Sequence, residues 1–292
     1  MIKLIKYRNF DCENPLELFD SLTISFKTAD QFNDPFDSAM VFDKDIVIDK
    51  LINDADFMNN FYKFVYNKEN HREPTQNEII DFINEAKLSN EMKESIYDNS
   101  IKAIEYVRKE YSVCCFSSRI DDPQLWGVYS DCGKGFAVEY DYDDVLMQST
   151  IYARGIGFYG KIVNKYIDYN KTNDQTLLLI DIIKTVYEYV AKHQIIRYEI
   201  SGTDEYDDIF FTKYGRWSYE DEYRFVIPNF YGNPRTNISL KKINCVYMGY
   251  NISEENEKKL IEICRRKIIK LYKMKVVFGT KEPKLVYVPV EI

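Results

Sequence analysis

The chain has 292 residues, of which 45% are hydrophobic, so it is long and apolar enough to fold around a substantial core. Its net charge of -8 disfavours a broad, non-specific grip on nucleic acid. The six cysteines include no C-x-x-C pair, and neither of the two histidines has a metal-ligand spacing from a cysteine, so no metal site is expected.

The amino-terminal segment reads as a strand, a short helix and a second strand. Residues 2–8 alternate apolar and polar side chains, which predicts the first strand. A short helix should follow, with Asn14 as its N-cap and Pro15 at its first position. Residues 22–26 predict the second strand.

The middle of the chain predicts helices placed between sheet elements. From about 46 to 110 the apolar residues recur at three- and four-residue spacing, which indicates a helical insert. The apolar residues at 111–117 predict a buried strand, and the glycine-containing segment at 151–159 predicts another. A second helical block is expected at about 174–199.

The segment 216–228, "RWSYEDEYRFVIP", predicts a strand with an unusual polar row. Side chains two residues apart lie on the same face of a strand, so Glu220, Glu222 and Arg224 should stand together. A helix capped by Ser253 and further strands are expected near the carboxyl end. These elements together predict one α+β domain over 1–292, with a mixed, mostly antiparallel sheet and helical insertions.

Neither a leader segment nor a membrane span is expected. The amino-terminal "MIKLIKYRNFD" has no apolar stretch of the kind found in secretory signals. The most apolar helical run, "TLLLIDIIKTVYEYV", contains Asp181 and Lys184 and is too short to cross a bilayer. A cytoplasmic protein with reduced thiols is therefore expected.

Several motifs resemble a bacterial family known as domain of unknown function 2971. They are "KYR" at 6–8, "FNDPFD" at 32–37, "CFS" at 115–117, "LWGVYSDCGKGFAVEYD" at 125–141, "FTKYGRWSYEDEYR" at 211–224 and "VYMGYNIS" at 246–253. They follow one another in the family's order over nearly the whole chain. The family label by itself implies little about function.

A second resemblance is to mono-ADP-ribosyltransferases of the Arg–Ser–Glu type, and it implies an ADP-ribosyltransferase-like sheet and NAD as substrate. That class uses an arginine on an early strand, a serine on a middle strand and a late E-x-E. This chain offers Arg8, Ser117 and the pair Glu220 and Glu222 in that order. It departs from the class in having "CFSS" where Ser-Thr-Ser is usual, and in the Trp217 that precedes E-x-E.

The resemblance also implies a role for each residue. Cleavage of the nicotinamide–ribose bond passes through an oxocarbenium-like state, which a carboxylate on the ribose 2′-hydroxyl stabilises as charge develops. Glu222 would be that carboxylate, and Glu220 would position or deprotonate the acceptor. Arg8 would hold a phosphate or the ribose, and Ser117 would orient the ribose or the glutamate. The further expected NAD-binding residues are Tyr7, Asn33, Asp37, Trp126 and Tyr129, and Trp217 and Arg224 are expected to contact the acceptor.

The expected acceptor is a protein or RNA, and the family analogy adds a toxin or anti-phage role with an antitoxin or regulatory partner. The basic segment 265–275 permits RNA binding, although a solvated face next to a buried stripe is the favoured interpretation of it. One alternative is a metal-dependent nuclease that uses Asp37, Glu139 and Glu222. The other is a non-catalytic interaction module, in which the polar row forms ordinary ion pairs, with Arg8 in a salt bridge and Ser117 as a strand-end cap.

Overall fold

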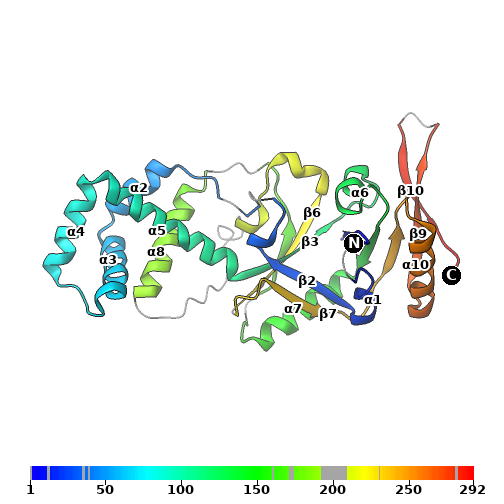
Figure 1. Ribbon diagram of the computed structural model, residues 1–292, viewed down its shortest axis with the longest axis horizontal. Helices are drawn as coiled ribbons and strands as arrows, with labels where there is room; N and C mark the ends of the chain where they lie inside the picture. Colours follow the sequence, from blue (N-terminus) through cyan, green and yellow to red (C-terminus); the bar gives the residue numbers. More distant parts are fainter. Residues whose placement is uncertain are drawn as a thin grey trace.

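The computed structural model describes residues 2–11, 14–34, 37–38, 40–159, 161–170, 174–191, 209–229, 231–279 and 282–292. Within them the centre of the molecule is a ten-stranded sheet (Figure 1). Its strands are β1 (Leu4–Arg8), β2 (Thr23–Thr28), β3 (Tyr111–Ser117), β4 (Phe136–Tyr140), β5 (Val163–Tyr166), β6 (Glu222–Pro228), β7 (Arg235–Ser239), β8 (Cys245–Met248), β9 (Lys270–Val277) and β10 (Lys284–Pro289).

The strands follow the order β10-β9-β8-β4-β1-β3-β2-β7, and β6 and β5 branch off from β3. Only β8 and β9 pair in parallel among these strands, because α10 connects them across the sheet. The predicted α+β class with a mixed, mostly antiparallel sheet is therefore confirmed.

The helices that the structure describes lie on both faces of the sheet and beyond one end of it (Figure 1). They are α1 (Leu18–Ser21), α2 (Lys44–Ile52), α3 (Ala55–Asn70), α4 (Gln76–Leu88), α5 (Asn90–Lys109), α6 (Pro123–Tyr129), α7 (Tyr142–Gly155), α8 (Thr176–Ala191) and α10 (Glu254–Lys267), with 3₁₀ turns η1 (Ala29–Gln31) and η2 (Gly215–Glu220). Helices α2, α3, α4 and α5 occupy the residues expected to be helical at 46–110, and α8 packs with them in one lobe. Of the second block expected at 174–199, α8 confirms the part to 191, and the rest lies outside the described residues.

The two faces of the sheet bury different clusters. On one face, Phe116, Phe136 and Phe225 pack beneath α7 and α10. On the other face, Val113 and Val226 join a cluster that continues into the helical lobe. Successive residues of a strand point to opposite faces, so this division assigns a face to every side chain of β1, β3 and β6.

One strand centres the arrangement, because β3 has three neighbours. Along one edge it pairs with β6 over its whole length, from Tyr111 opposite Pro228 to Ser117 opposite Glu222. Along its other edge it pairs with β2 near its beginning, where Val113 lies opposite Lys27, and with β1 at its end. The middle of this edge of β3, between Val113 and Ser117, is therefore paired with neither β1 nor β2.

Three sequence predictions of local structure are wrong. The strand expected at 151–159 is largely helix: α7 continues to Gly155, and its buried residues Val145, Ser149 and Ala153 recur every four positions. The first helix begins only at Leu18, so Asn14 is not its cap. The strand expected over 216–228 begins at Glu222, because the preceding residues form a 3₁₀ turn. The expected Ser253 cap is confirmed, since its side chain accepts a hydrogen bond from the Asn256 N–H.

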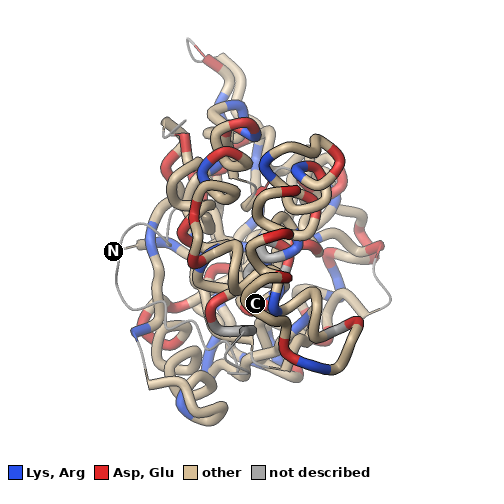
Figure 2. The backbone as a smooth tube through the Cα atoms, turned by 90° about the vertical axis from the view of Figure 1, so that its left-hand side faces the viewer, with Lys and Arg blue, Asp and Glu red and all other residues tan. Residues whose placement is uncertain are grey.

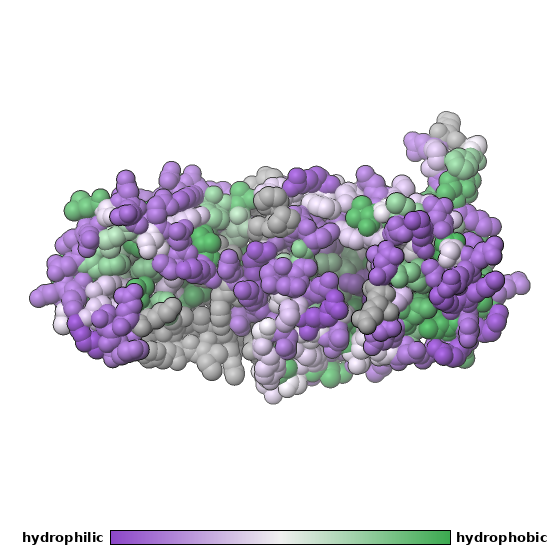
Figure 3. Space-filling model, viewed as in Figure 1, coloured by the Kyte–Doolittle hydropathy of each residue, from purple (hydrophilic) through white to green (hydrophobic). Residues whose placement is uncertain are grey.

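The face of the molecule shown in Figure 3 is mostly hydrophilic, and the β9–β10 hairpin projects from the body. At the end formed by the helical lobe, acidic and basic residues are interspersed along the backbone rather than separated (Figure 2). Among the described helices, none is both long enough and apolar enough to cross a bilayer.

Phe225 is completely buried between the sheet and α7, so Phe225→Ala should lower the free energy of unfolding by about 3–5 kcal/mol through the cavity it leaves. Tyr231→Ala is the matched control, because this side chain is 69% exposed and its loss should change stability by less than about 0.5 kcal/mol. Urea denaturation followed by circular dichroism measures both. Equal effects of the two substitutions would contradict the assigned core.

Candidate functional site

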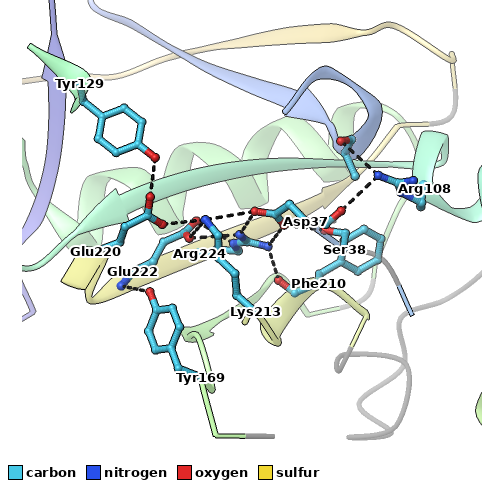
Figure 4. A network of polar contacts seen from close by, with 11 residues as sticks. Asp37, Ser38, Arg108, Tyr129, Tyr169, Phe210, Lys213, Glu220, Glu222 and Arg224 are labelled. Carbon is cyan, nitrogen blue, oxygen red and sulfur yellow. Dashed lines mark hydrogen bonds and ion pairs between the residues drawn. The ribbon is translucent and has the colours of Figure 1, made fainter. Parts of the chain in front are cut away.

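Five charged side chains from distant parts of the chain meet beneath one face of the sheet (Figure 4). They are Asp37, Lys213, Glu220, Glu222 and Arg224, and we call them the ionic cluster. Glu222 and Arg224 come from β6, Glu220 ends η2, Lys213 precedes that turn and Asp37 follows η1. Each side chain is at most 6% exposed, so their charges interact in a poorly solvated environment.

Arg224 lies at the centre of the cluster and is fully buried. Its Nη1 and Nη2 donate to the two carboxylate oxygens of Asp37 at 2.8 and 2.6 Å. Its Nε and Nη2 donate to the two oxygens of Glu222 at 2.7 and 3.1 Å, and Nη1 also donates to the Phe210 carbonyl at 2.8 Å. All five N–H donors of the guanidinium therefore have acceptors, which is the condition for burying this charge.

Glu220 and Glu222 both pair with Lys213, although Glu220 belongs to the 3₁₀ turn η2 and Glu222 to strand β6. Lys213 Nζ donates to Glu220 at 2.6 Å and to Glu222 at 3.2 Å, and lies 3.3 Å from Asp37. The polar row was expected on one strand, but Asp221 has a left-handed backbone with φ of 43°, which separates Glu220 from β6. The Glu222 N–H is held by the Tyr169 hydroxyl at 2.9 Å.

The cluster contains three carboxylates and two cations, and the two glutamates respond oppositely. Burial raises the pKa of Glu222, but attraction by Arg224 and Lys213 outweighs it, so the pKa lies well below its usual range. Burial also raises the pKa of Glu220, and here the attraction of Lys213 does not compensate, since Glu222 repels a second negative charge. The carboxyl of Glu220 is thus the member of this pair that gains a proton more readily.

Glu220 also connects the cluster to the molecular surface. The half-buried Tyr129 donates its hydroxyl hydrogen bond to Glu220 Oε1, and the side chain of the exposed Asn33 contacts the same hydroxyl. Burial, together with the charge of Glu220, raises the pKa of Tyr129, so it stays a donor. The half-buried ring of Trp217 lies 4.9 Å from Lys213 Nζ, at cation–π distance.

The structure separates the three residues expected to form an Arg–Ser–Glu site. Ser117 lies opposite Glu222 in the β3–β6 register, and its hydroxyl donates to the Glu220 carbonyl at 2.6 Å. Arg8 lies opposite Phe136 in the β1–β4 register, and therefore on the other face of the sheet. The expected convergence of Arg8 with the other two is wrong, because strand alternation points its side chain away from them. The alternative of a salt bridge from Arg8 to Glu222 or Asp37 is excluded for the same reason.

The remaining expected residues divide between cluster and core. Asp37, Asn33, Tyr129, Trp217 and Arg224 all contact the ionic cluster or its rim. Trp126 is fully buried, with its Nε1 donating to the Ile120 carbonyl, and Tyr7 packs edge-on against it. Trp126 therefore packs in the core beneath α6, where it is closed to a ligand, whereas Tyr7 is half-buried against it. Glu222 and Arg224 are both buried, so their ion pairs do not form a solvent-facing row on the strand.

Lys213 is the functional candidate that sequence reasoning missed. It lies within the motif "FTKYGRW", but no periodic pattern distinguishes it from a surface lysine. Tyr169 and Cys115 were missed as well. Cys115 lies opposite Arg224 in the register, and its thiol contacts Glu222.

Two cavities lie away from the ionic cluster. One of about 560 Å³ is lined by residues of α2, α4 and α5, and another of about 290 Å³ lies between β10 and the residues that follow β3. Within the described ranges, no three His, Cys, Asp or Glu side chains are grouped so as to hold a metal ion. Lys213 and Arg224 occupy the space among the three carboxylates of the cluster.

Comparison with known proteins supports one part of the sequence interpretation. The family described as Protein of unknown function (DUF2971) matches residues 125–225, which include Tyr129, Lys213 and the E-x-E segment. No curated protein and no solved structure matches the chain. The ADP-ribosyltransferase-like character of the sheet therefore stays a prediction.

Arg224→Met should lower the free energy of unfolding by about 3–5 kcal/mol, because it leaves Asp37 and Glu222 buried without their principal counter-ion. Arg266→Met is the matched control, since its pair with Asp20 is more than half exposed and its loss should leave stability nearly unchanged. Chemical denaturation at pH 7 measures both. A similar, small loss in the two variants would contradict a central role for Arg224.

Glu220→Gln and Glu222→Gln should change the pH dependence of stability in opposite directions. The unfolded state releases the glutamate proton near pH 4.3, whereas folded Glu220 retains it to higher pH, so ionisation of Glu220 costs stability as pH rises. Folded Glu222 stays ionised to lower pH, so its contribution is present above about pH 4.3 and is lost as pH falls below it. Relative to the parent protein, Glu220→Gln should gain stability between pH 4 and 7 and Glu222→Gln should lose it, as followed by urea denaturation. Parallel profiles would contradict the assignment.

Proposed function

We propose that this chain, a member of the DUF2971 family, is an enzyme that transfers ADP-ribose from NAD to a macromolecular acceptor, with Glu220 as the general base. The observation that carries the proposal is geometric: Glu220 and Glu222 share Lys213 within one buried ionic cluster, and only Glu220 is also hydrogen-bonded to Tyr129, which reaches the surface. Paired carboxylates whose environments separate their pKa values are typical of acid–base sites. Glu220, connected to the surface through Tyr129, takes the chemical role.

The proposed step balances without a metal or a redox partner. The bond between C1′ of the ribose and the nicotinamide nitrogen breaks, and its electron pair leaves with neutral nicotinamide. The acceptor nucleophile forms a bond to C1′ while its proton passes to the Glu220 carboxylate. A base with a raised pKa takes that proton more readily near neutral pH than an ordinary glutamate does.

Glu222 then acts through its neighbours rather than on the ribose. Both of its oxygens accept hydrogen bonds from Arg224, and one of them also pairs with Lys213. Its negative charge keeps Lys213 protonated and repels a second charge on Glu220. Glu222, Lys213 and Arg224 are thus positioning residues for Glu220.

The arrangement of the family-like motifs supports a functional cluster. Asp37 comes from "FNDPFD", Tyr129 from "LWGVYS", and the other members from "FTKYGRWSYEDEYR". These segments lie far apart in the chain, yet each contributes a side chain to the same network. A purely local structural role for each motif does not require that they meet.

The favoured acceptor is a protein. In the basic segment 265–275, Arg266 and Lys267 pair with Asp20, and Lys273 pairs with Glu257, which reduces the charge available for a nucleic-acid backbone. The proposal extends to a toxin or anti-phage effector in the cytoplasm, controlled by an antitoxin or regulatory partner.

Purified protein incubated with NAD labelled in its adenylate moiety and with bacterial lysate proteins should transfer label and release nicotinamide. Glu220→Gln should reduce both by at least about 100-fold, because the acceptor proton has no base. Tyr129→Phe removes a hydrogen bond that favours the ionised Glu220, so it should move the acidic limb of the rate profile to higher pH. Mass spectrometry of nicotinamide and of modified peptides measures these outcomes.

Glu254→Gln, on the exposed first turn of α10, is the matched control and should retain full activity. RNA is tested in parallel as the other possible acceptor. Label on RNA alone would contradict the proposed protein acceptor but would still support ADP-ribose transfer. Absence of nicotinamide release with every acceptor would sink the enzyme proposal and favour a non-catalytic interaction module.

A further inference from the structure

A group of cations lies where β1 and β2 part along the edge of β3. Lys6 and Arg8 come from β1, Lys27 from β2 and Arg235 from β7. Lys6 Nζ donates to the Cys115 carbonyl at 3.0 Å and lies 3.4 Å from the Cys114 sulfur, so it is directed at the uncovered stretch of the β3 edge. We call this place the strand notch.

The cations enter the strand notch from both faces of the sheet. Lys27 lies opposite Val113 in the β2–β3 register, on the face that carries the ionic cluster. Arg235 lies directly opposite Lys27 in the β2–β7 register, so these two like charges share a face. Lys6 and Arg8 alternate with Ile5 and Tyr7 along β1 and approach from the other face.

Such an arrangement of like charges is unfavourable by itself. Like charges directly opposite on neighbouring strands destabilise a sheet. Burial lowers the pKa of Lys27, and repulsion from Arg235, Lys6 and Arg8 lowers it further. Among the described residues, no carboxylate forms an ion pair with Lys6, Lys27 or Arg235. The charge of these three cations is therefore not balanced by the part of the chain that the structure describes.

We propose that the strand notch is an anion site that binds the phosphate groups of a ligand. The ammonium groups of Lys6 and Lys27 and the guanidinium of Arg235 suit a multiply charged phosphate, whose oxygens accept bidentate hydrogen bonds from arginine. A single carboxylate would leave most of the cationic charge unbalanced. Arg235 is exposed and Lys6 and Lys27 are half-buried, so an anion can approach these cations from solvent.

The site is independent of the proposed transfer chemistry. The Glu220 carboxyl lies in the ionic cluster, on the other side of β3 from the strand notch, and takes no part in holding the anion. Phosphate binding can therefore be measured without NAD cleavage, and either proposal can fail without the other.

Inorganic pyrophosphate is the first probe. At constant ionic strength, with sodium chloride as the comparison, pyrophosphate should raise the unfolding temperature of the parent protein and bind with a measurable Kd in isothermal titration calorimetry. Lys27→Gln and Arg235→Gln should each weaken binding about tenfold or more, since each removes a charge-assisted contact. Lys258→Gln, an exposed lysine on α10, makes the same change of charge and should bind as the parent does.

A second readout does not need the anion. At low salt and without pyrophosphate, Lys27→Gln should unfold at a higher temperature than the parent protein, because it removes a repelled cation. ADP-ribose is tested beside pyrophosphate to distinguish a nucleotide ligand from phosphate alone. If ADP-ribose binds more tightly than pyrophosphate and its affinity depends on Lys27, the ligand is a nucleotide. If the two bind with equal affinity, the site recognises only the phosphate groups. Glu254→Gln, on the exposed first turn of α10, should leave these affinities unchanged. Two results overturn the proposal. One is that pyrophosphate stabilises the protein no more than sodium chloride of the same ionic strength does. The other is that Lys27→Gln and Lys258→Gln bind pyrophosphate equally well.

Discussion

The burial of one guanidinium is the constraint on which the described structure depends. Arg224 is fully buried, and a buried charge is tolerable only when its donors have acceptors and its charge has partners. Asp37 and Glu222 supply both, and the Phe210 carbonyl completes the set. This requirement joins the loop after η1, the segment before η2 and strand β6 into a single arrangement.

The same constraint gives Glu220 its chemical character. Glu222 is committed to Arg224, so Lys213 is shared among three carboxylates and cannot neutralise all of them. Glu220 is left with the weakest compensation and with a tyrosine hydroxyl that leads to the surface. The structural ion pair of Arg224 with Glu222 and the titratable Glu220 are therefore parts of one network. Such a network lets a stable core contain a reactive carboxyl group. At the strand notch, by contrast, Lys6, Lys27 and Arg235 come together with no ion-paired carboxylate among the described residues, which is the basis of the proposed anion site.

Sequence patterns predicted the elements better than they predicted their junctions. The helical insert, the buried strand β3 and the capped helix α10 follow from periodicity and from short-range hydrogen bonds, which the local sequence contains. The start of β6 does not, because aspartate tolerates the left-handed backbone that Asp221 adopts after η2 without specifying it. Helix α7 was mistaken for a strand because its glycines suggested an irregular element, whereas its four-residue burial period appears only when the core is known.

For the candidate site, the sequence by itself determined that Glu222 and Arg224 share a face, since alternation along a strand is a property of the backbone. It also indicated that Asp37 and the E-x-E segment matter together with the family-like motifs. Only the tertiary structure decided which distant residues meet: it placed Arg8 on the opposite face, brought Lys213 between the glutamates and buried the whole cluster. The reason is that side-chain direction is local, whereas the pairing of strands and the exclusion of water depend on the entire fold.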